Sequence, residues 1–219
     1  MCNHLPNSLD TMQGSISDTA ESTLNIAQET GVVDHHEEHP DHRLFGVAVF
    51  LGAETMIFLG LFSAFLAYRL SAPVWPPEGT PGGLELFLPG INTLILISSS
   101  FVIHQADTAI KQNDVGGMQK WFAITVAMGA TFLAGQLYEY HHLEFGLTTN
   151  IFSSAFYTLT GFHGLHVFVG LLLMLAVLWR SRTPGHYSNE SHFGVEAVEL
   201  YWHFVDVVWI VLFFLLYIL

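Results

Sequence analysis

The chain has 219 residues, of which 51% are hydrophobic and 11% charged, and its formal net charge is −13 at pH 7. Soluble domains carry about 25% charged residues, so the composition excludes a soluble enzyme. Lys and Arg together number only six, which leaves no basic patch for phosphates and excludes a nucleic-acid-binding protein. The single cysteine, Cys2, cannot form an intrachain disulfide or a multi-thiolate metal centre. A polytopic membrane protein is the remaining class.

Residues 1–43 are acidic and polar, and they predict a disordered tail. Their first 30 residues lack the basic start and apolar run of a signal peptide, so we expect this tail to stay in the cytoplasm. The tail ends in a His-rich run at residues 34–42. Loose binding of a divalent metal is one interpretation of this run, and a solvated tail is the favoured one.

Residues 44–219 contain five long apolar stretches, and they predict an all-α bundle of five transmembrane helices. A helix needs roughly 20 apolar residues to cross a hydrocarbon core of about 30 Å, and each stretch is close to or above that length. The predicted spans cover residues 44–68, 89–110, 121–138, 153–179 and 196–219.

The basic residues predict the orientation of these spans. With the N-terminus in the cytoplasm, only Arg69 falls outside, and the C-terminus also lies outside. This topology follows the positive-inside rule. The basic residues on the cytoplasmic side are then Arg43, Lys111, Lys120, Arg180 and Arg182.

Polar groups inside the spans mark inward-facing surfaces, because charge in a bilayer is costly. Glu54 lies ten residues past Leu44, or roughly 15 Å deep, where we expect a protonated carboxyl bonded to a neighbouring helix. A reactive or proton-carrying carboxyl is the alternative. The fifth span carries a stripe spaced 3, 4 and 3, and the fourth span carries a second stripe at similar spacing. Both predict interhelical hydrogen bonds. The first stripe is Glu196, Glu199, His203 and Asp206, and the second includes Ser153, Tyr157, Thr160 and His163.

Small residues predict places of close helix approach. In the fourth span these are three glycines, and in the third span two pairs of alanines four residues apart. The positions are Gly161, Gly164 and Gly170, then Ala123 with Ala127 and Ala130 with Ala134.

The chain's 13 histidines call for a test of haem ligation. His163 and His166 are three residues apart on one helix, so they cannot bind opposite faces of one haem. A pair formed by His166 and His203 stays sterically possible and would make a small b-type cytochrome. An ion or proton transporter using Glu54 and the polar stripe is another alternative, although no repeated halves are visible. The residues alone predict no catalytic centre and no metal site.

Several motifs resemble subunit III of the haem–copper respiratory oxidases, in the right order over residues 43–219. Two are long and specific, and three shorter ones are in register. They are Gly161-Phe162-His163-Gly164-Leu165-His166-Val167, Tyr201-Trp202-His203-Phe204-Val205-Asp206-Val207-Val208-Trp209, Trp75-Pro76-Pro77, Asn92-Thr93 and Glu139-Tyr140.

The resemblance implies a non-catalytic subunit of a bacterial terminal oxidase in the cell inner membrane or another energy-transducing membrane. Such a subunit packs on subunit I, which holds haem and copper, in a complex that includes subunit II. It carries no redox cofactor, binds phospholipid in a cleft, and supports proton uptake and stability during turnover. Glu54 occupies the family's carbodiimide-reactive position. The resemblance places further residues in the helix-packing and lipid-cleft region: His163, His166, Glu199, His203, Asp206 and Trp75.

This chain departs from longer relatives, which have seven helices with the lipid cleft between the first two and the other five. A neighbouring subunit would have to supply the missing wall. The donor has two candidates. Glu139-Tyr140-His141-His142 and the His-rich tail also resemble quinol oxidases. Glu54, the Trp-Pro-Pro loop and the fuller Gly-Phe-His motif favour cytochrome c oxidase.

Overall fold

A computed structural model describes residues 42–75, 77 and 86–219. Within these residues five α-helices are long and apolar enough to cross a membrane, as predicted. They are α2 (His42–Ser71), α3 (Phe87–Lys111), α4 (Val115–His142), α5 (Ile151–Arg180) and α6 (Phe193–Phe213), which continues as a π-helix, η1 (Phe214–Ile218). The predicted tail lies outside the described residues, apart from His42 and Arg43.

Two of the helices, α4 and α5, begin before the predicted spans, at polar residues whose side chains cap their N-termini. The helix α4 begins six residues before the predicted start. Its N-cap is Asp114, whose side chain accepts a 2.8 Å hydrogen bond from the Gly117 N–H. Just before it, Asn113 has a φ of 60°, a conformation that asparagine tolerates better than most residues. At α5 a capping box joins Asn150 and Ser153.

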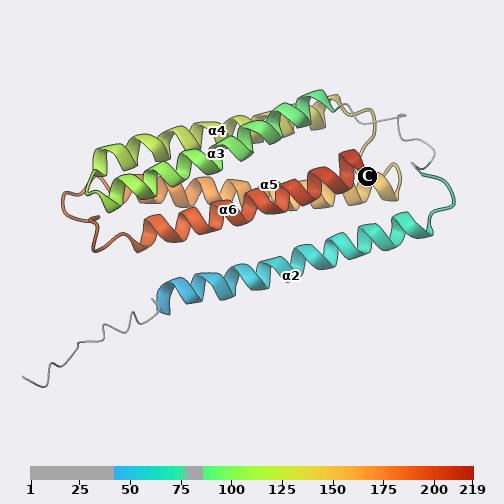
Figure 1. Cartoon of the computed structure of the whole chain (residues 1–219). Helices are drawn as coiled ribbons and strands as arrows, with labels where there is room; N and C mark the ends of the chain where they lie inside the picture. The colour runs from blue at the N-terminus through green and yellow to red at the C-terminus, as the bar shows by residue number, and fades with distance from the viewer. Residues whose placement is uncertain (1–41, 76, 78–85) are drawn as a thin grey trace, which may run out of the picture. The chain divides into compact units, whose positions relative to one another are not determined.

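Consecutive helices run in opposite directions, so the chain crosses the bundle five times within the described residues (Figure 1). The starts of α2, α4 and α6 share one end with the ends of α3 and α5, called here the Lys111 end. At this end Asn113 accepts from the Asn189 N–H at 2.9 Å, and the Gln119 amide donates to the Ser181 carbonyl at 3.1 Å.

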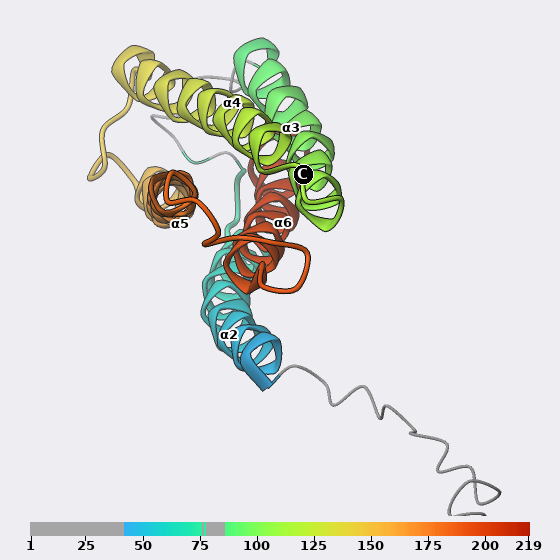
Figure 2. The ribbon, with the colours of Figure 1, turned by 90° about the vertical axis from the view of Figure 1, so that its left-hand side faces the viewer.

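The helix α6 is the centre of the bundle. It packs against α3, α5 and α2, whereas α2 contacts mainly α6. Figure 2 shows α6 between α2 and the α3–α4 pair, with α5 beside it. In an apolar 18-residue stretch of each helix, 50% is buried within the chain for the last helix (Phe193–Ile218) but only 11% for α2. The helix α2 therefore presents most of its apolar side chains to surroundings outside the chain.

Two tryptophans of α6 fix its position against α3. The indole of Trp202 donates to Ser99 Oγ at 2.8 Å, and that of Trp209 donates to Thr93 Oγ1 at 2.9 Å. Both rings are almost fully buried. An interhelical hydrogen bond in a membrane contributes about 0.6 kcal/mol on average, so these bonds add direction to a contact that packing stabilises.

Glycines make room for the Trp202 ring, and only some of the predicted small residues take part. A Cβ at Gly170 would lie 2.9 Å from the ring, and one at Gly129 2.7 Å from it. Gly161 and Gly164 have only ordinary contacts, at 3.8 and 3.9 Å. The predicted alanine pairs are wrong as internal contacts, because each alanine lies on the exposed face of α4: Ala123, Ala127, Ala130 and Ala134.

We therefore expect Gly170→Ala to destabilise the bundle by about 1–3 kcal/mol, the usual range for overpacking a filled core. The new methyl must displace Trp202, whose indole is tied to Ser99. Thermal unfolding of the detergent-solubilised protein measures the effect. Gly60→Ala is the matched control, since nothing lies within 4 Å of a Cβ there. Equal stability of the two variants would contradict the packing described for Trp202.

Candidate functional site

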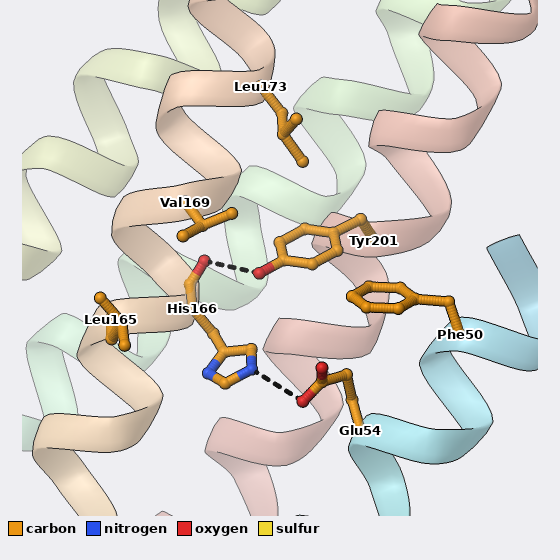
Figure 3. A pocket seen from close by; sticks show the side chains of 7 residues that line it. All are labelled: Phe50, Glu54, Leu165, His166, Val169, Leu173 and Tyr201. Carbon is orange, nitrogen blue, oxygen red and sulfur yellow. Dashed lines mark hydrogen bonds and ion pairs between the residues drawn. The ribbon is translucent and has the colours of Figure 1, made fainter.

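Glu54 of α2 and His166 of α5 meet across the boundary between these helices (Figure 3). His166 Nε2 lies 3.3 Å from Glu54 Oε2. The side chain of His166 is only 11% exposed and that of Glu54 20%. Phe58, one turn along α2, packs edge-on against the imidazole with ring centroids 5.0 Å apart. The partly buried carboxyl thus has an imidazole partner on a different helix.

The hydrogen bonds of His166 determine how many protons the pair holds. Its Nδ1 lies 2.8 Å from the carbonyl oxygen of Phe162, which can only accept, so Nδ1 carries a proton. A hydrogen bond between Nε2 and Glu54 then requires one further proton, held by either group. The pair is a carboxylic acid with imidazole or a carboxylate with imidazolium. In both cases it has no net charge, which suits a membrane interior.

An apolar cavity of about 400 Å³ lies beside this pair. The hydroxyl of Tyr201 donates to the carbonyl of His166 at 3.1 Å and forms part of the wall (Figure 3). The volume is within the range of small-ligand sites, and the polar groups are confined to the pair and the tyrosine. The lining residues are Phe50, Glu54, Leu165, His166, Val169, Leu173 and Tyr201.

A second polar region runs between α3 and α6, and we call it the α3–α6 seam. The stripe predicted on the last helix forms one side of it, and its partner is α3 rather than α5. The seam consists of Ser100, His104, Asp107 and Lys111 on α3, and Glu196, Glu199, His203 and Asp206 on α6.

The seam is held together by hydrogen bonds and ion pairs between titratable groups. Ser100 donates to Asp206, and its Oγ lies 3.2 Å from His203 Nδ1. Toward the Lys111 end, His104 Nδ1 lies 2.9 Å from Glu199 Oε1. The chain of contacts therefore extends from the deeply buried Asp206 to exposed groups near the helix ends.

Lys111 is the ammonium group of this seam. Its Nζ lies 2.7 Å from Asp107 and 3.7 Å from Glu196. Glu196 also pairs with His192 at 3.1 Å, just before the start of α6. The seam is thus polar over its whole length, in contrast to the apolar cavity on the other side of α6.

The remaining predicted residues lie apart from these two groups. His163 is fully buried between Phe132 and Trp209, with ring centroids 6.0 and 5.0 Å away. Its ring nitrogens have no hydrogen-bond partner among the described residues. Trp75 lies at the opposite end from Lys111, where Phe152 packs edge-on against it at 5.3 Å. Both positions serve helix packing.

The histidines considered for haem ligation are occupied by other contacts. The two ring nitrogens of His166 contact Phe162 and Glu54. Those of His203 contact Ser100 and Glu199. Axial ligation needs a free ring nitrogen from each of two histidines facing one haem, and His166 and His203 pack against different helices. The pair formed by His166 and His203 therefore does not fit a bis-histidine haem.

Sequence reasoning missed half of the seam and one further buried carboxyl. The α3 members His104, Asp107 and Lys111 are spaced 3 and 4, the same signal that identified the α6 stripe. At the other end, Glu139 of α4 accepts from the Tyr217 hydroxyl at 2.8 Å and from the Gln136 amide at 3.1 Å. Tyr217 lies in η1, a π-helix that the sequence did not predict.

Comparison with known proteins assigns this arrangement to a family. A profile described as "Cytochrome c oxidase subunit III" matches residues 13–219. The chain is 68% identical to a cytochrome c oxidase subunit 3 from Synechocystis sp., over 90% of this chain and 84% of the relative. A cytochrome c oxidase subunit 3 from Thermostichus vulcanus is 63% identical, over 85% of this chain and 92% of the relative. A cytochrome c oxidase subunit 3 from Ornithorhynchus anatinus is 36% identical, over 88% of this chain and 76% of the relative.

The proton count of the Glu54–His166 pair makes a spectroscopic prediction. We expect the form in which Glu54 is a carboxylic acid and His166 a neutral imidazole. An infrared difference spectrum between wild type and Glu54→Gln should then contain the carbonyl stretch of a protonated carboxylic acid. The band should shift in D₂O. His166→Phe removes the partner and should move it. A difference spectrum with only carboxylate bands would instead assign the proton to His166.

Proposed function

Because this chain belongs to the haem–copper oxidase subunit III family, we propose that it is the non-catalytic subunit III of a bacterial cytochrome c oxidase. Its role is to pack on subunit I, with subunit II in the same complex, and to support proton uptake and turnover stability during O₂ reduction. The observation that carries this proposal is the Glu54–His166 pair beside an apolar cavity, in a chain whose candidate haem ligands are engaged elsewhere.

Haem and copper belong to the partner subunits in this proposal. The chain has one cysteine, and the nitrogens of His166 and His203 are held by neighbouring groups. The chain would act on the redox centres only indirectly, through the position of the subunit that holds them.

Phospholipid is the proposed ligand of the cavity. Its wall is mostly aliphatic and aromatic, which suits an acyl chain, and the neutral pair removes the cost of a charge facing that chain. The helix α2 forms one side of the cavity and is the least buried of the five helices. A neighbouring subunit packed on α2 would complete the wall that longer relatives build with two additional helices.

Subunit I is the proposed direct partner of the exposed faces. Large apolar side chains on α2 are open, including Phe45, Met56 and Ile57, which are 65%, 71% and 49% exposed, respectively. A lipid or a protein helix can cover such a surface in a membrane. No nucleic acid is expected, given the six basic residues.

The proposed topology places the Lys111 end in the cytoplasm. The basic residues Arg43, Lys111, Lys120 and Arg180 lie within two or so turns of helix termini at this end, and Arg69 lies at the other end. The positive-inside rule then puts the N-terminus in the cytoplasm and the C-terminus outside, in the cell inner membrane or another energy-transducing membrane.

Cytochrome c is the proposed electron donor, supported by the relatives from Synechocystis sp. and Thermostichus vulcanus, both named cytochrome c oxidase subunit 3. A quinol oxidase is the alternative, based on the Glu139-Tyr140-His141-His142 pattern. The purified complex separates them by which reduced donor it oxidises. A proton transporter is the more distant alternative, and the chain alone in liposomes would then dissipate a proton gradient.

The proposal predicts that Glu54→Ala leaves the initial oxidase rate nearly unchanged but reduces the number of turnovers before inactivation several-fold. The alanine removes the hydrogen bond from Glu54 of α2 to His166 of α5, and it loosens the cavity wall. Glu54→Gln keeps a group that can donate to His166, so it should retain most of the lifetime. Progress curves of O₂ consumption measure both quantities. An immediate loss of most activity in Glu54→Ala would instead place Glu54 on an obligatory proton route.

A further inference from the structure

Three side chains of the α3–α6 seam converge on one point near the Lys111 end. His104 and Asp107 come from adjacent turns of α3, and Glu199 comes from α6. A ligand atom from each lies within 4.8 Å of the other two. His104 is exposed at its side chain and Glu199 is 13% exposed, so the cluster is reachable from outside the bundle. Imidazole nitrogen and carboxylate oxygen are the donors that bind Zn²⁺ and related divalent ions.

Asp107 supplies an independent indication that a ligand belongs here. The residue is 2% exposed. Its Oδ2 pairs with Lys111, but its Oδ1 is buried and has no hydrogen-bond partner among the described residues. Leaving a buried polar atom unsatisfied costs roughly 1–3 kcal/mol, more if the group is charged. A cation bound at this oxygen would remove that cost.

The charge balance of the seam points in the same direction. At the Lys111 end of the seam, Asp107, Glu196 and Glu199 are three carboxyl groups near one ammonium group, that of Lys111. When these three carboxyls are ionised and the neighbouring histidines are neutral, −3 and +1 leave a formal charge of −2 at this end of the seam. Lys111 already fills the space between Asp107 and Glu196. Glu199 has no ammonium group within ion-pair distance among the described residues, and a ligand atom of Asp107 lies within 4.8 Å of it.

We propose that His104, Asp107 and Glu199 form a binding site for one divalent ion of the Zn²⁺ class. His104 would bind through Nδ1, the nitrogen that faces Glu199, with its proton on Nε2. Three protein ligands leave a fourth position for water. Tetrahedral bonds of about 2.0–2.1 Å set ligand atoms about 3.4 Å apart. The ligand atoms now lie within 4.8 Å of one another, and His104 Nδ1 lies 2.9 Å from Glu199 Oε1, so each separation changes by little more than 1 Å at most. The bound ion connects α3 to α6.

Neighbouring groups modulate this site without being its ligands. His203 Nε2 lies 3.5 Å from Glu199 Oε1 and competes for that carboxylate when protonated. Lys111 competes for Asp107 in the same way. His192 and Glu196 form their own pair. Arg43 lies over the ring of Phe193 at 6.0 Å, near the start of α6. Zinc affinity should therefore fall as the pH decreases, because protons compete with the metal for its ligands.

The test is Zn²⁺ binding to the purified, chelator-treated oxidase complex, measured by calorimetry and by zinc X-ray absorption. Wild type should bind one ion with nitrogen and oxygen ligands at about 2.0–2.2 Å. His104→Ala and Glu199→Gln should each weaken this ion by about tenfold or more. His141→Ala is the matched control, an exposed histidine on α4 away from the seam, and it should bind like wild type. A variant in which His35, His36 and His39 are replaced by alanine distinguishes Zn²⁺ bound by the N-terminal His-rich run from Zn²⁺ bound at the proposed site.

A variant of the competing ammonium group gives a result of opposite sign. Lys111→Met frees the second oxygen of Asp107, so zinc affinity should rise several-fold, and added Zn²⁺ should raise the thermal stability of this variant. Unchanged binding in His104→Ala, or binding lost only with the three tail histidines, would overturn the proposal. Absence of a high-affinity ion in wild type would overturn it as well. If Lys111→Met does not assemble, the comparison of His104→Ala with His141→Ala decides.

Discussion

A helix in hydrocarbon satisfies its own backbone, but its polar side chains must find partners on other helices, because no water is available to them. This requirement organises the present bundle around α6. On one face, Trp202, Trp209 and Asp206 bond to Ser99, Thr93 and Ser100 of α3. On another, Tyr201 bonds to the backbone of α5. The remaining helices are arranged around α6, whose buried polar side chains form hydrogen bonds to α3 and α5.

The same requirement separates two regions with different chemistry. Between α2 and α5 there is one carboxyl, one imidazole and one cavity, and the pair is neutral whichever group holds the proton. Between α3 and α6 the groups are more numerous, partly exposed and collectively acidic. A lipid chain suits the first region and a cation the second. The weak attachment of α2, which the Glu54–His166 contact reinforces, is the physical basis of our proposal that a change at Glu54 affects the lifetime of the complex more than its initial rate.

Much of this arrangement could be predicted from the sequence, and the exceptions have physical causes. Five apolar stretches predicted five helices, because length and hydropathy alone decide whether a segment crosses a membrane. The 3-4-3 stripe on α6 correctly marked an inward face, but spacing along one helix does not say which helix faces it, and the partner was α3. The alanine pairs of α4 show the same limit: small residues permit close approach, and here a different face of α4 packs inward. Gly170 and Gly129 are tight because side chains from elsewhere in the bundle lie against them, Trp202 against both, Leu171 against Gly129 and Tyr201 against Gly170.

Tertiary contact also created the sites that the sequence left open. Glu54 and His166 are 112 positions apart, and no periodicity connects them. Lys111, His104 and Asp107 were visible as individual residues near a helix end. Their significance comes from Glu199, which another helix brings to within 2.9 Å of His104. The η1 π-helix at the C-terminal end followed from no local pattern that we recognised.

The central claim is that this chain is part of an oxidase and holds no redox centre itself. The most direct test is the visible absorption spectrum of the chain purified alone, set beside that of the intact complex. Haem bands are expected in the complex and none in the isolated five-helix chain, whose helical circular dichroism should show that it is folded. Stoichiometric haem absorbance in the isolated, folded chain would instead mean that this chain binds haem itself.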